Sequence, residues 1–301
     1  MKKRLTRFLP FLLAFTIALP SYSVFAEEEN QAKETQTNET NKTQADETTA
    51  NDTLSLAAET AVLIDAASGE ILYDKDADKK MYPASITKLM TILLALENGK
   101  LTDEITFSHD AVYNIEPGSA HIAILEGETL TLEQVLRAII LRSANEASNG
   151  VAEYVDGSVE AFAKHMTERA KELGCTNTNF VNANGLFDEN HYTTAHDMAL
   201  IARELLKHEE YRSMMSETDY EIPPTNLQTE TRYLHGQHQM LNPNSIYYYK
   251  DAIGGKTGYT VEAGNTLVTY AERDGLTLIA VVMKCNGAEH YTDTAALFDY
   301  G

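Results

Sequence analysis

Hydrophobic and polar residues alternate in a way that predicts strands near both ends of the folded part of the chain. Short β-rich runs cover 61–65 and 70–73 on either side of Ser68-Gly69, which is the pattern of a hairpin. Near the C-terminus, the runs 266–272 and 276–283 are separated by Arg273-Asp274-Gly275, a strong hairpin signal. We therefore expect one hairpin to open the fold and another to close it.

Between these hairpins the hydrophobic period becomes that of helices. Residues 85–97 are apolar on nearly every face after Lys88, which predicts a helix buried in the core, with its N-terminal end deep in the protein. Thr131 and Gln134 have capping-box spacing, and the helix behind them is expected to end at about Arg142. Helices are also expected over 159–173 and 195–207. This order of elements predicts an α+β domain, with helices packed on an antiparallel sheet.

The first 54 residues follow neither pattern. Basic residues precede an apolar run at 8–20, and Val24 and Ala26 fit a cleavage site, so 1–26 is interpreted as a secretory signal peptide. The run has 13 residues, whereas a membrane-spanning helix needs about 20. Residues 27–54 carry eight acids and two lysines with almost no large apolar residue, which predicts a disordered acidic tether. We expect an exported protein, in the cell wall or secreted, with no membrane span after cleavage and one domain over 55–301.

The charge and the cysteine count exclude some classes of binding partner and of structural site. The formal net charge of −21 excludes the basic surface that a nucleic-acid-binding protein needs. Two cysteines, Cys175 and Cys285, cannot form a disulfide framework or a Cys-rich zinc site. A single bridge between them is conceivable, but small buried thiols are the favoured interpretation.

A candidate nucleophile lies at the start of the buried helix. Ser85 and Lys88 are three residues apart, which places hydroxyl and amine on one helical face. A lysine activates a serine only when its amine is neutral, and burial favours the neutral form. The pattern is short, and a helix cap followed by a lysine with a buried stem would produce it equally well.

Two further motifs contain polar groups at expected turns and strands. Ser143-Ala144-Asn145 falls where one expected helix ends and another begins, so its side chains can face a cleft or form an ordinary turn. Lys256-Thr257-Gly258 precedes the last hairpin. Glycine at a strand position usually permits the close approach of another backbone or of a ligand, although a plain loop glycine is the alternative.

Taken in order, Ser85-Ile86-Thr87-Lys88, Ser143-Ala144-Asn145 and Lys256-Thr257-Gly258 resemble the motif set of penicillin-binding proteins and serine β-lactamases. The neighbouring sequence is similar to that of low-molecular-mass D-alanyl-D-alanine carboxypeptidases at 83–88, 184–186, 194–199, 256–260 and 297–301. The resemblance covers about 60–301. It implies the β-lactamase/transpeptidase-like fold, an antiparallel sheet flanked by helices with a mostly helical lobe.

This resemblance also implies a role for each motif residue. Ser85 would attack the carbonyl of a terminal D-Ala-D-Ala bond of a peptidoglycan stem peptide, with Lys88 as the base, and water would then release the shortened peptide. Backbone N–H groups of Ser85 and Tyr259, the latter beside Gly258, would form the oxyanion hole. Ser143 and Asn145 would relay a proton and hold the substrate amide. Lys256 and Thr257 would bind the terminal carboxylate, and β-lactams would acylate the same serine.

Several related activities are distinguished by what the sequence contains. No Glu-x-x-Leu-Asn element lies between Asn145 and Lys256, so efficient β-lactam hydrolysis is not expected. No His-Glu-x-x-His is present, and His191, His196, His235 and His238 are interpreted as surface or packing histidines, so neither a metal nor a cofactor is expected. A sensor that binds penicillin or peptidoglycan without turnover, and a D,D-transpeptidase or endopeptidase, remain alternatives.

Three local features complete the prediction. The second motif continues as Asn145-Glu146, where the family usually has Asp after the Asn, so the turn is expected to differ in detail. Family members usually continue into a small β-rich domain and an amphipathic anchor helix, whereas this sequence stops at Gly301. We expect the catalytic domain without these parts, either because the sequence is a fragment or because the protein is released or held in another way. The tyrosines 247–249 are expected to pack on the sheet at a strand edge, with a groove for the stem peptide as the alternative.

Overall fold

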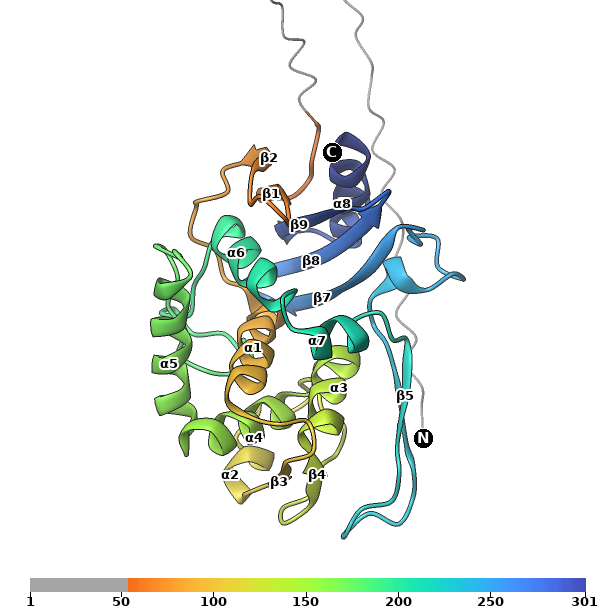
Figure 1. Cartoon of the computed structure of the whole chain (residues 1–301). Coiled ribbons are helices and arrows are strands. Elements are labelled where there is room, and N and C mark those ends of the chain that lie inside the picture. Colours follow the sequence, from red (N-terminus) through yellow and green to blue (C-terminus); the bar gives the residue numbers. More distant parts are fainter. Residues whose placement is uncertain (1–53) are drawn as a thin grey trace, which may run out of the picture. The chain divides into compact units, whose positions relative to one another are not determined.

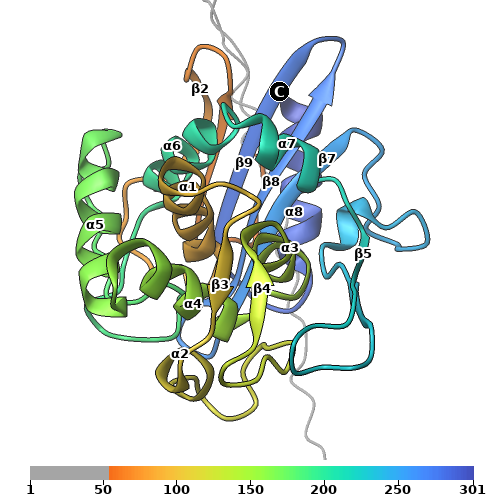
Figure 2. The same cartoon turned by 60° about the horizontal axis from the view of Figure 1, so that its bottom comes forward.

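A five-stranded antiparallel sheet forms the centre of the protein. The structure, a computed structural model, describes residues 54–301; the predicted signal peptide and all but the last residue of the predicted tether lie outside them. The strand order is β2-β1-β9-β8-β7, which leaves β7 as an edge strand (Figures 1 and 2). The strands are β1 (Thr60–Asp65), β2 (Ile71–Lys75), β7 (Ala252–Thr260), β8 (Gly264–Arg273) and β9 (Leu276–Cys285).

Both predicted hairpins are confirmed. β1 pairs antiparallel with β2, and β8 pairs antiparallel with β9. Arg273 lies opposite Leu276, so Asp274 and Gly275 form a two-residue turn. Both have positive φ, 53° and 85°, as a type I′ turn requires, which explains why Asp-Gly suits this position.

Helices surround the sheet and form a lobe below it in Figure 1. The helices are α1 (Lys88–Asn98), α2 (His109–Tyr113), α3 (Leu132–Arg142), α4 (Asn145–Asp156), α5 (Val159–Glu172), α6 (Ala195–Leu205), α7 (Glu209–Met214) and α8 (Glu289–Tyr300), with 3₁₀ turns η1 (Ala84–Thr87) and η2 (Gln239–Leu241). Two short strand pairs complete the lobe: β3 (Glu104–Thr106) with β4 (Thr129–Thr131), and β5 (Asp219–Ile222) with β6 (Arg232–His235). The α+β prediction, with helices on an antiparallel sheet, is confirmed.

The sheet separates two hydrophobic cores. α6 packs on β1 and β9 on the side of the helical lobe, whereas α8 packs on β8 and β9 on the other side. Because β-strand side chains alternate between faces, β8 contributes Val268 to the first core and Leu267 to the second. The sheet is therefore covered on both faces.

α1 runs through the centre of the larger core. Its residues from Lys88 to Ala95 are all buried, as its uniformly apolar sequence predicts. One detail of the prediction is wrong: Ser85 is in the 3₁₀ turn η1, and the α-helix begins only at Lys88. Ala84, the first residue of this turn, has a positive φ of 51°, which is not a helical conformation.

The other predicted helices are confirmed to within two residues. Thr131 Oγ1 accepts the Gln134 N–H at 3.3 Å and Gln134 Oε1 accepts the Thr131 N–H at 2.9 Å, which completes the predicted capping box of α3. α5 and α6 end at Glu172 and Leu205, slightly before the predicted ends.

The remaining packing predictions concern cysteines and tyrosines. Cys175 and Cys285 are free and buried, as favoured. Tyr247 stacks on Tyr291 of α8 at 5.0 Å, and Tyr249 packs on Phe298 at 5.5 Å. These tyrosines therefore pack against α8, but from a loop and not from a strand edge. Within residues 54–301, no helix has the length and apolarity to cross a bilayer.

Candidate active site

The candidate nucleophile and base meet at the junction of η1 and α1. Residues three apart eclipse each other in a 3₁₀ turn. Lys88 Nζ lies 2.9 Å from Ser85 Oγ as a result. Ala84, just before the serine, has a left-handed φ of 51°, a conformation that costs a non-glycine residue energy and that surrounding contacts must hold in place.

Lys88 is fully buried and has three oxygen neighbours. Besides Ser85 Oγ, its Nζ contacts Asn145 Oδ1 at 2.8 Å and the main-chain oxygen of Asn184. A neutral amine has two N–H groups for the two carbonyl oxygens and one lone pair for the serine hydroxyl. The arrangement thus suits a neutral amine that accepts the Ser85 proton.

Electrostatics favour the same neutral form. Burial lowers the pKa of Lys88 well below its usual range, and the positive charge of Lys256 lowers it further, while the Glu146 carboxylate acts in the opposite direction. Burial raises the pKa of Glu146, so that carboxyl holds its charge less firmly than an exposed one.

Ser143 and Asn145 occupy the junction between α3 and α4. Ser143 ends α3 with a left-handed φ of 57°, which turns the chain so that Asn145 can begin α4 toward Lys88. Both side chains are buried, and Ser143 Oγ has no hydrogen-bond partner within the described residues. A hydroxyl in that state is costly unless it serves a bound molecule.

Lys256 approaches from the edge strand β7. Its side chain is 2% exposed and its Nζ donates to the main-chain oxygen of Thr257 at 2.8 Å. Burial lowers the pKa of Lys256 to about 7. Thr257 follows on the strand, half-buried, and Tyr259 is 63% exposed at the free edge.

Gly258 confirms the expectation of a close backbone approach. A Cβ at this position would lie 2.8 Å from the Ser85 nitrogen and 2.4 Å from Thr266 Oγ1. Thr266 Oγ1 also donates to the Pro83 carbonyl at 2.8 Å, which ties β8 to the turn. The nucleophile turn therefore rests directly on β7 and β8.

A second support reaches the turn from the segment before α6, and the sequence analysis did not foresee it. Gly185, with φ of 83°, passes so close to Ala84 that a Cβ would lie 1.9 Å from the Ala84 oxygen. His191 accepts the Val181 N–H on Nδ1, so its Nε2–H donates to Thr87 Oγ1 at 2.8 Å. From the sequence, 184–186 stands out only as a segment similar to the carboxypeptidase family, and nothing in the sequence connects that segment with Ser85.

The four histidines behave as predicted. His191 is buried, and burial lowers its pKa to about 4; burial likewise lowers the pKa of His238 to about 3. His196 and His235 lie nearer the surface and pair with Asp78 and Asp219. Among residues 54–301, no three His, Cys, Asp or Glu side chains are grouped closely enough to hold a metal ion.

Comparison with known proteins relates this geometry to a family. The sequence model of the D-alanyl-D-alanine carboxypeptidases (Peptidase_S11) matches residues 44–287. The chain is 38% identical over 235 residues to the D-alanyl-D-alanine carboxypeptidase DacF of Bacillus subtilis, covering 76% of this chain and 58% of that protein. It is 34% identical over 240 residues to DacC of Escherichia coli, covering 76% and 57%.

Solved structures of DD-peptidases are also similar to this chain. The Streptomyces K15 DD-transpeptidase superimposes with a TM-score of 0.76 at 25% identity, covering 82% of this chain and 97% of that one. A D-alanyl-D-alanine carboxypeptidase from Mycobacterium tuberculosis gives a TM-score of 0.74 at 27% identity, covering 82% and 91%. The chain spans 56–66% of the length of the first curated relatives that it matches.

Proposed function

This chain belongs to the family of D-alanyl-D-alanine carboxypeptidases, and from that premise we propose that it is a serine-type D-Ala-D-Ala carboxypeptidase. It would remove the terminal D-alanine from peptidoglycan stem pentapeptides through an acyl-enzyme on Ser85. The observation that carries the proposal is the buried amine of Lys88, 2.9 Å from Ser85 Oγ. A buried amine beside a serine hydroxyl is the requirement for nucleophilic attack without a histidine.

In the first half of the reaction, Ser85 Oγ attacks the carbonyl of the penultimate D-Ala and Lys88 takes its proton. The N–H groups of Ser85 and Tyr259 stabilise the resulting oxyanion. Gly258 supports this assignment, because its lack of a Cβ lets β7 approach the Ser85 nitrogen. The Ser143 hydroxyl, which has no hydrogen-bond partner among residues 54–301, then passes a proton to the departing amine, and Asn145 holds the substrate amide.

Lys256 and Thr257 bind the terminal carboxylate in this proposal. The net charge of −21 repels anions at long range, but exposed charges are screened beyond about 8 Å at physiological salt. A buried lysine in direct contact therefore dominates. Because its pKa is about 7, carboxylate binding would also draw a proton onto Lys256. A cationic Lys256 in turn keeps Lys88 neutral.

In the second half of the reaction, water hydrolyses the acyl-enzyme, with Lys88 again as the base. This step regenerates the free Ser85 hydroxyl. β-Lactams, which carry a carboxylate and a reactive amide, would acylate the same residue. The proposal includes a leader at 1–26 and an acidic tether at 27–54, which would bring the catalytic domain to the peptidoglycan outside the cytoplasm.

The test is release of D-alanine from an N-acylated peptide that ends in D-Ala-D-Ala. Matched peptides that end in D-Ala-L-Ala, or in a C-terminal amide, are the controls, because the first changes the stereocentre and the second removes the carboxylate. We expect release from the first peptide alone. Penicillin binding without release of D-alanine from any peptide would favour a sensor and overturn the proposal.

A further inference from the structure

Glu146 places a buried carboxylate next to the proposed catalytic groups. It is the second residue of α4, directly after Asn145, whose Oδ1 contacts Lys88 Nζ at 2.8 Å. Glu146 is 1% exposed. Burying an ionisable side chain is costly, so a carboxyl group at this position needs a physical reason.

The two carboxylate oxygens of Glu146 have different surroundings. Oε1 accepts the Ile122 N–H at 2.7 Å and the Ile124 N–H at 3.5 Å. Oε2 is buried and has no hydrogen-bond partner among residues 54–301. Main-chain N–H donors favour the ionised carboxylate, but they carry no net charge. The negative charge of Glu146 is therefore not cancelled by a contact.

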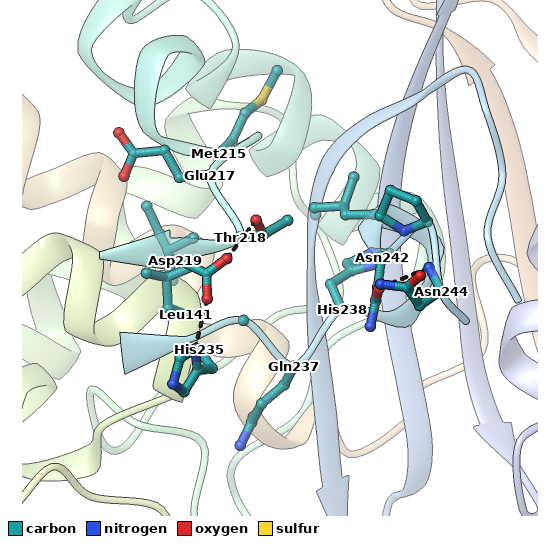
Figure 3. A pocket seen from close by; sticks show the side chains of 15 residues that line it. Leu141, Met215, Glu217, Thr218, Asp219, His235, Gln237, His238, Asn242 and Asn244 are labelled. Carbon is teal, nitrogen blue, oxygen red and sulfur yellow. Dashed lines mark hydrogen bonds and ion pairs between the residues drawn. The ribbon is translucent and has the colours of Figure 1, made fainter. Parts of the chain in front are cut away.

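Other carboxylates of the same lobe are paired with basic side chains. At the cavity of about 340 Å³ beside β7, Asp219 contacts His235 Nδ1 at 2.6 Å (Figure 3). Glu128, which is fully buried, accepts from Arg232 through both oxygens, each at 2.7 Å. In the described part of the chain, Glu146 has main-chain N–H partners only.

The hydrogen bonds of Glu146 fasten the segment 120–124 to the start of α4. The Asn145 N–H donates to the Ala120 carbonyl at 2.9 Å, and Glu146 accepts the N–H of Ile122 two residues later. Consecutive residues of α4 are thus bonded to the same segment. This arrangement fixes the first turn of the helix, from which the Asn145 side chain reaches the proposed base.

Two charges of opposite sign act on Lys88. Lys256 disfavours a positive charge on Lys88, and the Glu146 carboxylate favours one. When Lys88 takes the Ser85 proton, it becomes a second cation in a buried site, and a nearby carboxylate lowers the energy of that state. Because the interaction is mutual, the new cation also favours the ionised form of Glu146.

We propose that Glu146 is a positioning residue for the acylation step. Its Oε1 holds Asn145 and the segment 120–124 in place. Its negative charge stabilises the ammonium form that Lys88 adopts on taking the Ser85 proton. This inference rests on the proposed function.

The assisted step is balanced in protons and electrons. The Oγ–H bond of Ser85 breaks, and the oxygen forms a bond to the substrate carbonyl carbon. The π electrons of the carbonyl move onto its oxygen, and the proton binds the lone pair of the Lys88 amine. Glu146 neither gains nor loses a proton in this step.

The other charged groups near this pair leave its interaction intact. His121, exposed in the segment that Glu146 binds, slightly opposes the effect of burial on the pKa of Glu146. Burial lowers the pKa of His191 to about 4, so it stays neutral near pH 7. Basic side chains of the helices packed on α4 have acidic partners, as in His109–Glu126, Arg137–Glu217 and Arg169–Glu97. The remaining charged side chains of α2, α3, α5 and β3 are at least partly exposed, so water and salt screen them.

The pH dependence of acylation tests the proposal. The second-order rate of acylation by a fluorescent penicillin should fall on the acidic side, where Lys88 gains a proton. In Glu146→Gln the amide oxygen can still accept the Ile122 N–H, but the charge that favours the ammonium form is lost. The acid limb should therefore move by about one unit to lower pH. An acid limb that stays at the wild-type pH overturns the inference.

The shift can be measured at a single pH. One unit below the wild-type midpoint, the wild type should retain about a tenth of its own maximal rate and Glu146→Gln about half. Glu153→Gln is the matched control, because it removes a carboxylate from the same helix, one that accepts the Ser108 hydroxyl. A shift of the same size in Glu153→Gln would assign the effect to overall charge and contradict the proposal.

Shorter side chains separate the charge from the hydrogen bonds. Glu146→Asp keeps the charge but has a shorter reach to Ile122, so its acid limb should stay at the wild-type pH while thermal unfolding shows a lower stability. If Glu146→Gln does not fold, Glu146→Asp and Glu146→Asn repeat the comparison of charged and neutral side chains at equal size. Equal acid limbs in that pair contradict the inference.

The outcomes also distinguish this inference from the proposed function. Release of D-alanine and formation of acyl-Ser85, together with an unmoved acid limb in Glu146→Gln, overturn only the role of Glu146. Absence of D-alanine release and of acyl-Ser85 in the wild type overturns the proposed function as well.

Discussion

The close approach of β7 to the nucleophile turn makes Gly258→Ala the most informative single substitution. The new Cβ would meet the Ser85 nitrogen at 2.8 Å and Thr266 Oγ1 at 2.4 Å. Ordinary contacts are about 3.5 Å or longer, so the strand and the turn must separate by about 1 Å. Both proposed oxyanion donors lie on the surfaces that separate. Such a displacement costs about 100-fold in rate, comparable with the loss of one oxyanion donor.

The assay is the second-order rate of acylation by a fluorescent penicillin, with thermal unfolding measured on the same sample. Gly157→Ala is the matched control, because Gly157 has a positive φ of 77° and no neighbouring atom that a Cβ would meet. The control should lose about 1 kcal/mol of stability and keep its acylation rate. Acylation of a folded Gly258→Ala protein within threefold of the wild-type rate would refute the contact as the reason for this glycine.

Three further predictions concern the groups around the nucleophile. Lys88→Met keeps the buried volume but removes the base, so the acylation rate should fall by about 10²–10⁴-fold in the same penicillin assay. Above pH 7, Lys256 loses its proton, so kcat/KM for a peptide with a free carboxylate should fall with rising pH, and Lys256→Met should remove this alkaline limb together with most activity. Thr87→Val leaves the His191 Nε2–H buried without an acceptor, and thermal unfolding should show a loss of about 1–3 kcal/mol. An unchanged rate, a flat pH profile or an unchanged melting temperature would contradict the respective prediction.

The buried Lys256 side chain also makes the free energy of unfolding depend on pH. Its folded pKa of about 7 lies below the usual value of 10.5, so the unfolded chain binds the proton more tightly between these limits. The contribution of this residue to the free energy of unfolding therefore rises with pH from about 7 to about 10.5. A lysine that destabilises the fold at neutral pH is understandable only if its charge is used.

Strong local signals allowed much of the fold to be predicted. The Asp274-Gly275 turn, the capping box of Thr131 and the apolar run of α1 each act within a few residues, and the structure has them where expected. α8 was not predicted, because its buried face includes His290, Asp293 and Thr294, so its sequence has no continuous apolar stripe. The 3₁₀ turn that contains Ser85 packs closely against Gly185 and Gly258, which are distant in sequence.

In the candidate site, too, the contacts between residues close in sequence were predictable and those between distant segments were not. Ser85 and Lys88 are close in sequence, so their contact follows from helical geometry, and the three motifs together predicted the remaining polar groups of the site. The contact of Lys88 with the Asn184 carbonyl and the support of Thr87 by His191 join segments about 100 residues apart. Backbone carbonyls have no sequence signal at all, so only the structure reveals such partners.

The central claim is that Ser85 becomes acylated, and the intact mass of the protein tests it most directly. Wild-type protein and Ser85→Ala are each exposed to penicillin and weighed, and peptide mapping locates any adduct. We predict an increase equal to one penicillin on the wild type alone, on the peptide that contains Ser85. No adduct on the wild type, or an equal adduct on Ser85→Ala, would contradict the account.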